Sequence, residues 1–221
     1  MTLQVLYIID QGTPTFEAER TAVDVVCAGD SLTGYNNSSF PVRYWPFRTY
    51  PDYLQELCVP FELRIANGGI EWAVSDDAPQ QVRDYLALSP NACYFVIGMG
   101  MNDLRLSPKK EATSKRIIEN LGQMVQLVRD KGKQAILFNV PYVNEAEYEP
   151  LLAKVLRAQR DYHNAMLMDF CEENRLPLAD ICSRLLDAQC GDELHPNEDG
   201  AKIIAEEIFK ELAALHKGAA R

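Results

Sequence analysis

Short, largely apolar runs alternate with longer amphipathic segments along this chain, and this alternation is the feature that most constrains the fold. Residues 22–28, 92–97 and 134–140 are runs of strand length that end at turn-forming residues. Residues 76–88 and 113–131 lie between them and carry apolar side chains at helical spacing. Strands that alternate with helices predict a parallel sheet covered by helices on both faces and connected by right-handed crossovers.

The other expected elements complete one domain over residues 1–221. Further strands are expected at residues 3–9, 61–66 and 176–181, and further helices at residues 51–57, at 149–174 and after Asn197. Residues 67–69 are expected to form a flexible loop, residues 11–15 to break the first strand, and residues 98–103 to form a Gly-rich turn. Residues 1–21 are an N-terminal extension with an edge-strand candidate, and residues 216–221 are a tail.

The composition limits the classes of partner. A net charge of −10 at pH 7 argues against nucleic acid or an anionic membrane surface as the main partner. No stretch has the length of a membrane-spanning helix, and the N-terminus lacks the features of a signal peptide, so we expect a cytoplasmic protein. The six cysteines include no C-x-x-C pair, which argues against a zinc site and favours free thiols.

The first chemical candidate is a serine at the end of the run at residues 22–28. Gly29 and Asp30 favour a bend, and Ser31 follows at the carboxyl end of the expected strand, where open α/β sheets place their chemistry. Taken alone, the stretch also fits an ordinary strand-to-helix connection. A serine is a weak nucleophile, so a catalytic role requires a base, a group that orients the base and an oxyanion site.

His195 is the candidate base. It lies in a short turn with Asp192 three residues earlier, a spacing that lets the carboxylate hold one imidazole nitrogen while the other faces Ser31. The alternative is a surface histidine that caps the last helix. His163, inside a long helix, and His216, in the tail, are expected at the surface or partly packed.

Oxyanion donors are expected on loops that follow other strands. Asn102 offers a side-chain amide from a Gly-rich turn, the turn at residues 67–69 offers backbone N–H groups, and Ser31 offers its own N–H. The alternative for each is a turn residue that satisfies local backbone groups.

Three blocks at residues 29–32, 100–103 and 192–196, in this order, resemble those of the GDSL (SGNH) hydrolase family. They read Gly-Asp-Ser-Leu, Gly-Met-Asn-Asp and Asp-Glu-Leu-His-Pro, and the resemblance spans about residues 23–212. The first block differs from the G-x-S-x-G turn of α/β-hydrolases, which argues against that fold.

The resemblance implies a flavodoxin-like three-layer αβα sandwich with a central five-stranded parallel sheet. It also implies ester hydrolysis through an acyl-enzyme, without a metal or another cofactor. By position, Ser31 matches the nucleophile, His195 the general base and Asp192 its orienter. Asn102 and the Ser31 N–H match two oxyanion donors.

One block departs from the family pattern. The family often has Asn-x-x-Ile-x-Gly. Here the run from Asn67 reads Asn-Gly-Gly-Ile-Glu-Trp, so Trp72 occupies the position of that glycine. A backbone N–H survives every substitution except proline, so Trp72 is one candidate for the remaining donor. A shifted loop that uses Gly69 is the other.

The leading hypothesis is a serine esterase that acts on small, soluble acyl or acetyl esters. A carbohydrate O-acetyl esterase is the second, since Tyr35, Tyr44, Trp45 and Trp72 lie on or near the loops that flank the serine and aromatic rings stack on sugars. The alternative is that these rings pack the loops together. Asp30, Tyr35 and Trp45 are the candidate substrate-binding residues. A catalytically inactive binding protein with the same fold is a third hypothesis, supported only by Trp72 in the expected oxyanion loop. A nucleotide binder is disfavoured because no G-x-G-x-x-G motif is present.

Overall fold

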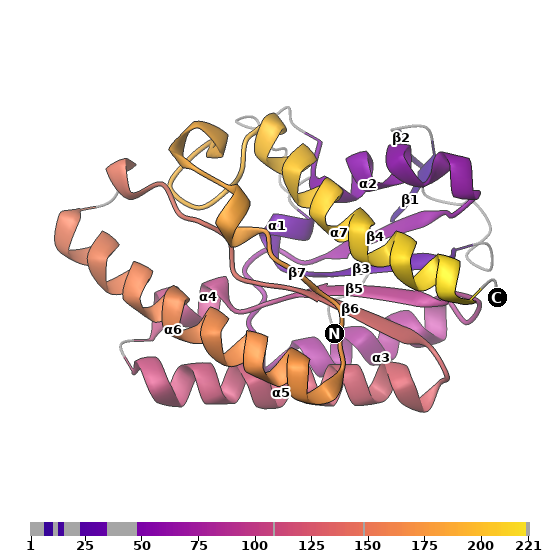
Figure 1. Cartoon of the computed structure of the whole chain (residues 1–221), viewed down its shortest axis with the longest axis horizontal. Coiled ribbons are helices and arrows are strands. Elements are labelled where there is room, and N and C mark those ends of the chain that lie inside the picture. The colour runs from indigo at the N-terminus through magenta and orange to yellow at the C-terminus, as the bar shows by residue number, and fades with distance from the viewer. Residues whose placement is uncertain are drawn as a thin grey trace.

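The computed structural model describes residues 7–10, 13–15, 23–34, 48–107, 109–147 and 149–219, and shows a sheet between two layers of helices (Figure 1). The strands are β1 (Tyr7–Asp10), β2 (Thr13–Thr15), β3 (Val25–Gly29), β4 (Ile65–Gly69), β5 (Tyr94–Gly98), β6 (Gln134–Phe138) and β7 (Leu178–Ala179). The helices are α1 (Ser31–Gly34), α2 (Tyr50–Cys58), α3 (Ala78–Leu88), α4 (Met101–Leu106), α5 (Lys110–Asp130), α6 (Pro150–Asn174) and α7 (Glu198–Ala219). Short 3₁₀ turns lie at Val59–Phe61, Glu145–Glu147, Cys182–Arg184 and Asp187–Gln189.

Five strands form the expected parallel centre of the sheet. The strand order is β2-β1-β4-β3-β5-β6-β7, and every pair from β4 to β7 is parallel. β1 and β2 extend the β4 edge in antiparallel pairing. The predicted three-layer α/β fold is therefore confirmed. α1 and α4 lie at the same end of the sheet (Figure 1), because each begins just after a parallel strand ends.

Two apolar cores hold the helices against the sheet. α3, α5 and α6 cover one face, while α2 and α7 cover the other (Figure 1). The periodic pattern predicted for α5 is confirmed, because its apolar stripe is buried against the sheet side. This stripe consists of Ile117, Leu121, Met124, Val125 and Val128. Among the described helices, none has the length and apolar character needed to cross a membrane.

The strand expected at residues 61–66 lies further along the chain, as β4. The backbone first passes through a left-handed conformation at Glu62, with φ 55°, and only then pairs in register with β3. Residues 67–69, expected as a flexible loop, are therefore buried inside the sheet. Gly69 permits a close approach to α1, since a Cβ there would lie 2.1 Å from the backbone nitrogen of Gly34.

The chain ends also differ from expectation. Residues 3–6 of the first expected strand lie outside the described residues, and its described part is Tyr7–Asp10. Thr13–Thr15, expected to break that strand, form β2 at the sheet edge. α7 continues through Ala219, so the described part of the expected tail is helical, and His216 Nδ1 lies 3.2 Å from the Tyr94 hydroxyl.

His163 corrects another expectation, because its side chain is fully buried rather than near the surface. It lies seven residues after Leu156 and four before Leu167, so all three share the face of α6 that packs into the protein. The prediction failed because a polar residue at a core position of a helix looks like a surface residue when it is considered alone.

Candidate active site

Ser31 lies at a sharp bend between β3 and α1. The strand ends at Gly29, where a Cβ would lie 2.3 Å from the Thr33 hydroxyl oxygen, so only glycine fits. Asp30 closes the bend: its Oδ1 accepts the N–H of Leu32 at 3.0 Å, and its carbonyl oxygen accepts the N–H of Thr33 at 3.1 Å. These contacts fix the serine at the carboxyl end of a central strand.

His195 meets Ser31 from the loop that precedes α7. Its Nε2 lies 3.0 Å from Ser31 Oγ, and its Nδ1 lies 2.8 Å from Asp192 Oδ2. The second carboxylate oxygen of Asp192 accepts the backbone N–H groups of Leu194 at 2.7 Å and of His195 at 2.6 Å. The structure thus brings together the three side chains that the sequence nominated, in one hydrogen-bonded chain.

Asp192 is held as a carboxylate. Partial burial acts to raise its pKa, but the hydrogen bonds from the His195 ring and from two backbone N–H groups outweigh burial, so the pKa lies below its ordinary value. An ionised Asp192 favours the imidazole tautomer with its proton on Nδ1. That tautomer leaves Nε2 able to accept the proton of the Ser31 hydroxyl.

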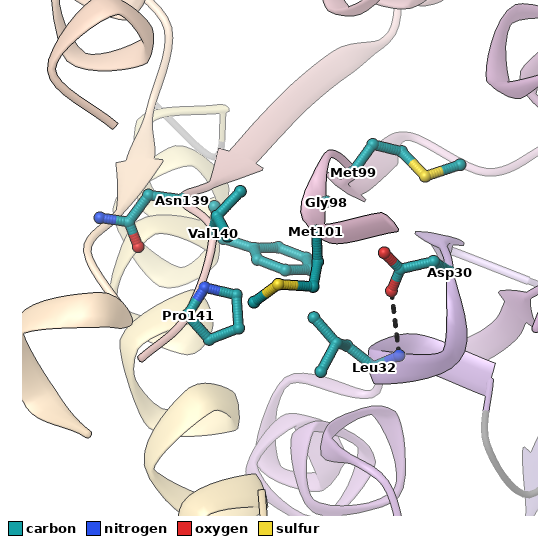
Figure 2. Close-up of a pocket in the computed structure, with 9 residues that line it drawn as sticks. Asp30, Leu32, Gly98, Met99, Met101, Asn139, Val140 and Pro141 are labelled. Atoms are coloured by element: carbon teal, nitrogen blue, oxygen red, sulfur yellow. Dashed lines mark hydrogen bonds between the residues drawn. The ribbon is translucent and has the colours of Figure 1, made fainter. Parts of the chain in front are cut away.

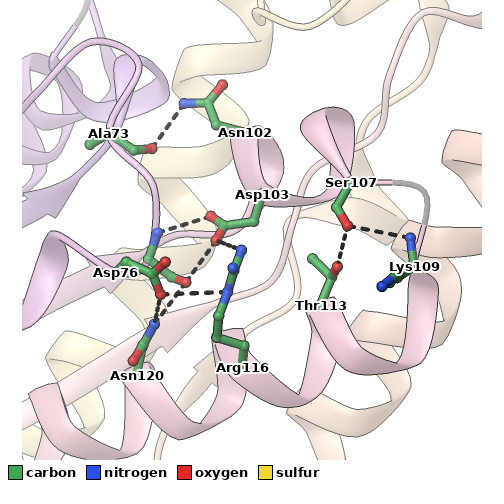
Figure 3. Close-up of polar contacts among 10 residues, drawn as sticks. Ala73, Asp76, Asn102, Asp103, Ser107, Lys109, Thr113, Arg116 and Asn120 are labelled. Carbon is green, nitrogen blue, oxygen red and sulfur yellow. Dashed lines mark hydrogen bonds and ion pairs between the residues drawn. The ribbon is translucent and has the colours of Figure 1, made fainter.

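Asn102 lies buried in the first turn of α4. Its Nδ2 donates to the carbonyl oxygen of Ala73 at 3.0 Å, which ties α4 to the loop that follows β4 (Figure 3). An amide nitrogen carries two hydrogens, so one N–H is used by this contact and the other is available to a ligand.

Trp72 adopts a backbone conformation that usually favours glycine. Its φ is 61°, in the left-handed region, and the Ala73 N–H closes the turn by donating to the carbonyl oxygen of Ile70 at 3.2 Å. The resemblance places a glycine at this position, and the left-handed conformation of Trp72 is one that glycine adopts without strain. The bulky indole is directed outward, with 67% of the residue exposed.

Two backbone N–H groups are candidate oxyanion donors. Within the described part of the chain, neither the Ser31 N–H nor the Trp72 N–H has a hydrogen-bond partner. Gly69 is a correction to the expected set, because its N–H already donates to Asn67 Oδ1 at 3.0 Å inside β4. The loop therefore has not shifted toward Gly69, and that residue serves the close packing of β4 against α1.

Of the candidate substrate-binding residues, the structure describes Asp30. Asp30 is buried, and burial raises the pKa of its carboxyl group to about 6. It lines a cavity of about 10 Å³ together with Leu32, Met101 and Val140 (Figure 2). This space is about the size of one water molecule. Tyr35 and Trp45 lie outside the described residues.

A rim formed by Trp72, Arg105 and Glu193 links the loop after β4 to the histidine loop, and sequence reasoning missed Arg105 and Glu193. The Arg105 guanidinium lies 5.8 Å from the centre of the Trp72 ring, and its Nη2 lies 3.6 Å from Glu193 Oε1. Arg105 follows Asn102 by three positions on α4, so helical spacing was the signal that placed it near the site.

Comparison with known families finds one whose model matches most of the chain. The model of the GDSL-like Lipase/Acylhydrolase family matches residues 27–203, which include Ser31, Asn102, Asp192 and His195. Among curated proteins, the comparison finds no match.

Solved structures share the fold. A catalytic mutant of Axe2, an acetylxylan esterase from Geobacillus stearothermophilus, aligns with a TM-score of 0.64 at 17% identity, over 87% of this chain and 94% of its own. A carbohydrate acetylesterase family member from Sinorhizobium meliloti aligns with a TM-score of 0.66 at 16% identity, over 89% and 99%. A GDSL-like lipase from Bacteroides thetaiotaomicron gives 0.65 at 19% identity, over 90% and 91%.

Proposed function

Because the chain belongs to the GDSL-like lipase/acylhydrolase family, we propose that it is a serine esterase that hydrolyses small acyl or acetyl esters. The observation that carries this proposal is the continuous hydrogen-bonded chain from Asp192 through His195 to Ser31, with distances of 2.8 Å and 3.0 Å. A serine, a base within reach and a carboxylate that orients the base are the parts that nucleophilic acyl transfer requires.

In the acylation step, Ser31 Oγ attacks the carbonyl carbon of the ester while His195 Nε2 accepts the hydroxyl proton. Asp192 stabilises the imidazolium that forms, because its charge lies against Nδ1. The tetrahedral intermediate then collapses, the C–O bond to the alcohol breaks, and His195 returns the proton to the leaving alkoxide. The acyl group is left on Ser31 Oγ.

In the deacylation step, a water molecule takes the place of the alcohol. His195 accepts a proton from the water, the resulting hydroxide attacks the acyl carbon, and the second tetrahedral intermediate expels Ser31 Oγ. The proton passes from His195 back to the serine, and the free carboxylic acid leaves. The same residues therefore serve both halves of the reaction.

The negative charge of each tetrahedral intermediate needs fixed donors. The Ser31 N–H, the Trp72 N–H and the second N–H of Asn102 are the groups that we assign to this role. Each lies shortly after the carboxyl end of a parallel strand, β3, β4 or β5, so all three are expected at one edge of the sheet. Loss of one such donor costs about 10²–10³ in kcat.

Hydrolysis of an aryl acetate by the whole chain tests this function. The wild-type protein should turn over the ester, and Ser31→Ala should reduce kcat to near background. Ser183→Ala is a matched control. Ser183 lies in a 3₁₀ turn and takes no part in the hydrogen bonds that join Asp192, His195 and Ser31, so the loss of its hydroxyl should leave turnover intact. Hydrolysis that survives in Ser31→Ala contradicts the proposed mechanism.

A carbohydrate O-acetyl esterase is the second candidate, and the exposed Trp72 ring supports it. An indole at the rim of the site, flanked by Arg105, offers a surface on which a sugar ring stacks. Acetate release from acetylated oligosaccharides, compared with aryl acetates of equal concentration, separates the two candidates. A higher kcat/KM for the oligosaccharide selects the carbohydrate esterase.

The inactive binding protein has lost its main support. Its case rested on Trp72 disrupting the donor loop, but the left-handed backbone and the unengaged N–H of this residue support a working donor. Absence of both ester turnover and covalent labelling by a fluorophosphonate would restore that hypothesis.

A further inference from the structure

We propose that Asp103 is a positioning residue that holds the Trp72 loop in the conformation that presents its N–H to the oxyanion. The inference rests on the proposed function, since it assigns a task within the same reaction. Asp103 follows Asn102 on α4, and its side chain is fully buried. It touches none of the reacting groups, so its effect passes through the loop after β4.

The contacts of Asp103 are directed at that loop. Its Oδ2 accepts the backbone N–H of Ser75 at 2.9 Å, and its Oδ1 accepts the Ser75 hydroxyl at 2.8 Å. The preceding residue, Asn102, donates to the carbonyl oxygen of Ala73 at 3.0 Å. Two successive residues of α4 therefore hold two backbone positions of the loop, immediately after Trp72.

This attachment explains how a strained residue stays in place. Trp72 adopts φ 61°, which L side chains enter at a cost, and a free loop would relax toward an extended or right-handed backbone. A relaxed loop would turn the Trp72 N–H away from its present direction. The three bonds from α4 to Ala73 and Ser75 oppose that movement.

A second set of side chains, from α5, supports the same attachment (Figure 3). Arg116 Nη2 lies 3.3 Å from Asp103 Oδ1, and its Nε lies 3.4 Å from Asp76 Oδ1. Asn120 Nδ2 donates to the Ser75 hydroxyl oxygen at 3.1 Å and to Asp76 Oδ1 at 2.8 Å. The loop is thus clamped between α4 and α5 by charged and amide groups.

The chemistry of Asp103 favours positioning over simple packing. A buried carboxylate costs free energy unless its oxygens are fully used, whereas an apolar side chain would fill the same space without that cost. Both oxygens of Asp103 are used, and the two Ser75 donors belong to the loop. A carboxylate supplies two acceptor oxygens side by side, so it can accept hydrogen bonds from both the N–H and the hydroxyl of Ser75.

The test compares Asp103→Asn with Ser75→Ala in aryl acetate hydrolysis. Asp103→Asn places an NH₂ group against a backbone N–H or a guanidinium, so the loop loses its anchor. We expect kcat to fall about 10- to 100-fold with KM changed less than about 2-fold, since the oxyanion exists only along the reaction path. Ser75→Ala keeps the backbone bond and should lose less, about 3- to 10-fold in kcat.

The binding affinity of a boronic acid that mimics the tetrahedral intermediate is a second measurement. A purely structural role of Asp103 would leave this affinity unchanged. The affinity should weaken in Asp103→Asn by about the same factor as kcat/KM, because both depend on the oxyanion donors. Thr113→Val is the matched control. Thr113 is also buried and donates to Ser107 Oγ at 2.7 Å, but it does not contact the Trp72 loop, so kcat should stay within about 2-fold.

Several outcomes overturn the inference. The inference is overturned if Asp103→Asn has the same kcat as Thr113→Val, or if its effect is confined to KM. It is also overturned if the boronic acid binds Asp103→Asn as tightly as it binds the wild-type protein. If Asp103→Asn fails to fold, Ser75→Ala decides, and an unchanged kcat in that variant overturns the inference. A wild-type protein that is inactive and unlabelled at Ser31 removes the proposed function itself, and the inference with it.

Discussion

Ser31 Oγ and His195 Nε2 lie 3.0 Å apart although 164 positions separate the two residues in the chain. The contact exists because Ser31 follows β3 and the segment that carries His195 follows β7. The carboxyl ends of these parallel strands lie at the same edge of the sheet. The short turn of residues 192–195 then aims the imidazole, because one Asp192 oxygen binds the backbone and the other binds the ring.

Asp192→Asn should lower kcat for an aryl acetate by about 10²–10⁴, because the amide no longer stabilises the imidazolium and favours the wrong tautomer. Steady-state kinetics measure this effect. Asp187→Asn is the matched control: it removes one charge nearby, where Asp187 accepts the Tyr142 hydroxyl at 2.9 Å, and activity should be retained. Equal activities of the two variants contradict the role of Asp192.

Trp72→Gly should be more stable than Trp72→Ala by about 1 kcal/mol. Both variants lose the indole, but only glycine occupies φ 61° without strain, and this outweighs the extra freedom of glycine in the unfolded chain. Urea unfolding at neutral pH measures the difference. An alanine variant of equal or higher stability means that the left-handed conformation at this position is not maintained.

His163→Leu should become more stable than the wild type as the pH falls from 6.5 to 4. Burial lowers the pKa of His163 from 6.5 to about 4, and within the described residues neither ring nitrogen has a hydrogen-bond partner. Between these pH values the unfolded chain binds a proton that the folded protein excludes, so wild-type stability is lost as the pH falls. The relative gain of the variant is about 3 kcal/mol.

The effect of Asp30 on stability has the opposite pH dependence to that of His163, so an Asp30 variant provides the comparison. Burial raises its pKa from 3.8 to about 6, so its favourable contribution is present below pH 3.8 and is lost as the pH rises through 6. Asp30→Asn should therefore gain stability over the wild type with rising pH, whereas His163→Leu gains with falling pH. Urea unfolding across pH 3.5–7 separates them, and parallel curves for the two variants contradict the assignments.

Gly69→Ala should destabilise the fold by about 2–4 kcal/mol and lower activity, because the new Cβ meets the backbone of Gly34 at 2.1 Å and displaces α1. Thermal unfolding and aryl acetate turnover measure the two effects. Gly122→Ala is the control, since a Cβ there makes ordinary contact with Phe170 at 3.6 Å and the helix gains propensity. A tolerated Gly69→Ala argues against this close approach.

The parts of the fold with strong periodicity were predictable from the sequence. The buried stripe of α5 and the apolar runs that became β3, β5 and β6 carry their own pattern, so their type and order follow from local residues. The meeting of Ser31, Asp192 and His195 at one edge of the sheet was predictable for another reason. Each lies in a short block whose spacing is set by its chemistry, and the parallel sheet makes loops after strands converge.

The parts that depend on distant contacts were not predictable. Residues 67–69 have the composition of a turn, and only pairing with β3 and the approach of Gly34 make them part of a strand. Asp103 looks like any acidic residue of a short helix, because its partner Ser75 lies 28 positions away. Arg105 and Glu193 meet only after the sheet has brought two loops together.

The most direct test of the account is to look for the acyl-enzyme itself. The wild-type protein is mixed with an aryl acetate, quenched in acid within the first turnover and digested for peptide mass spectrometry. We expect one acetyl group on Ser31, formed and lost at rates compatible with kcat, and absent from Ser31→Ala. Ester hydrolysis that proceeds at the same rate with no acyl group on Ser31, or with the acyl group on another residue, contradicts the account.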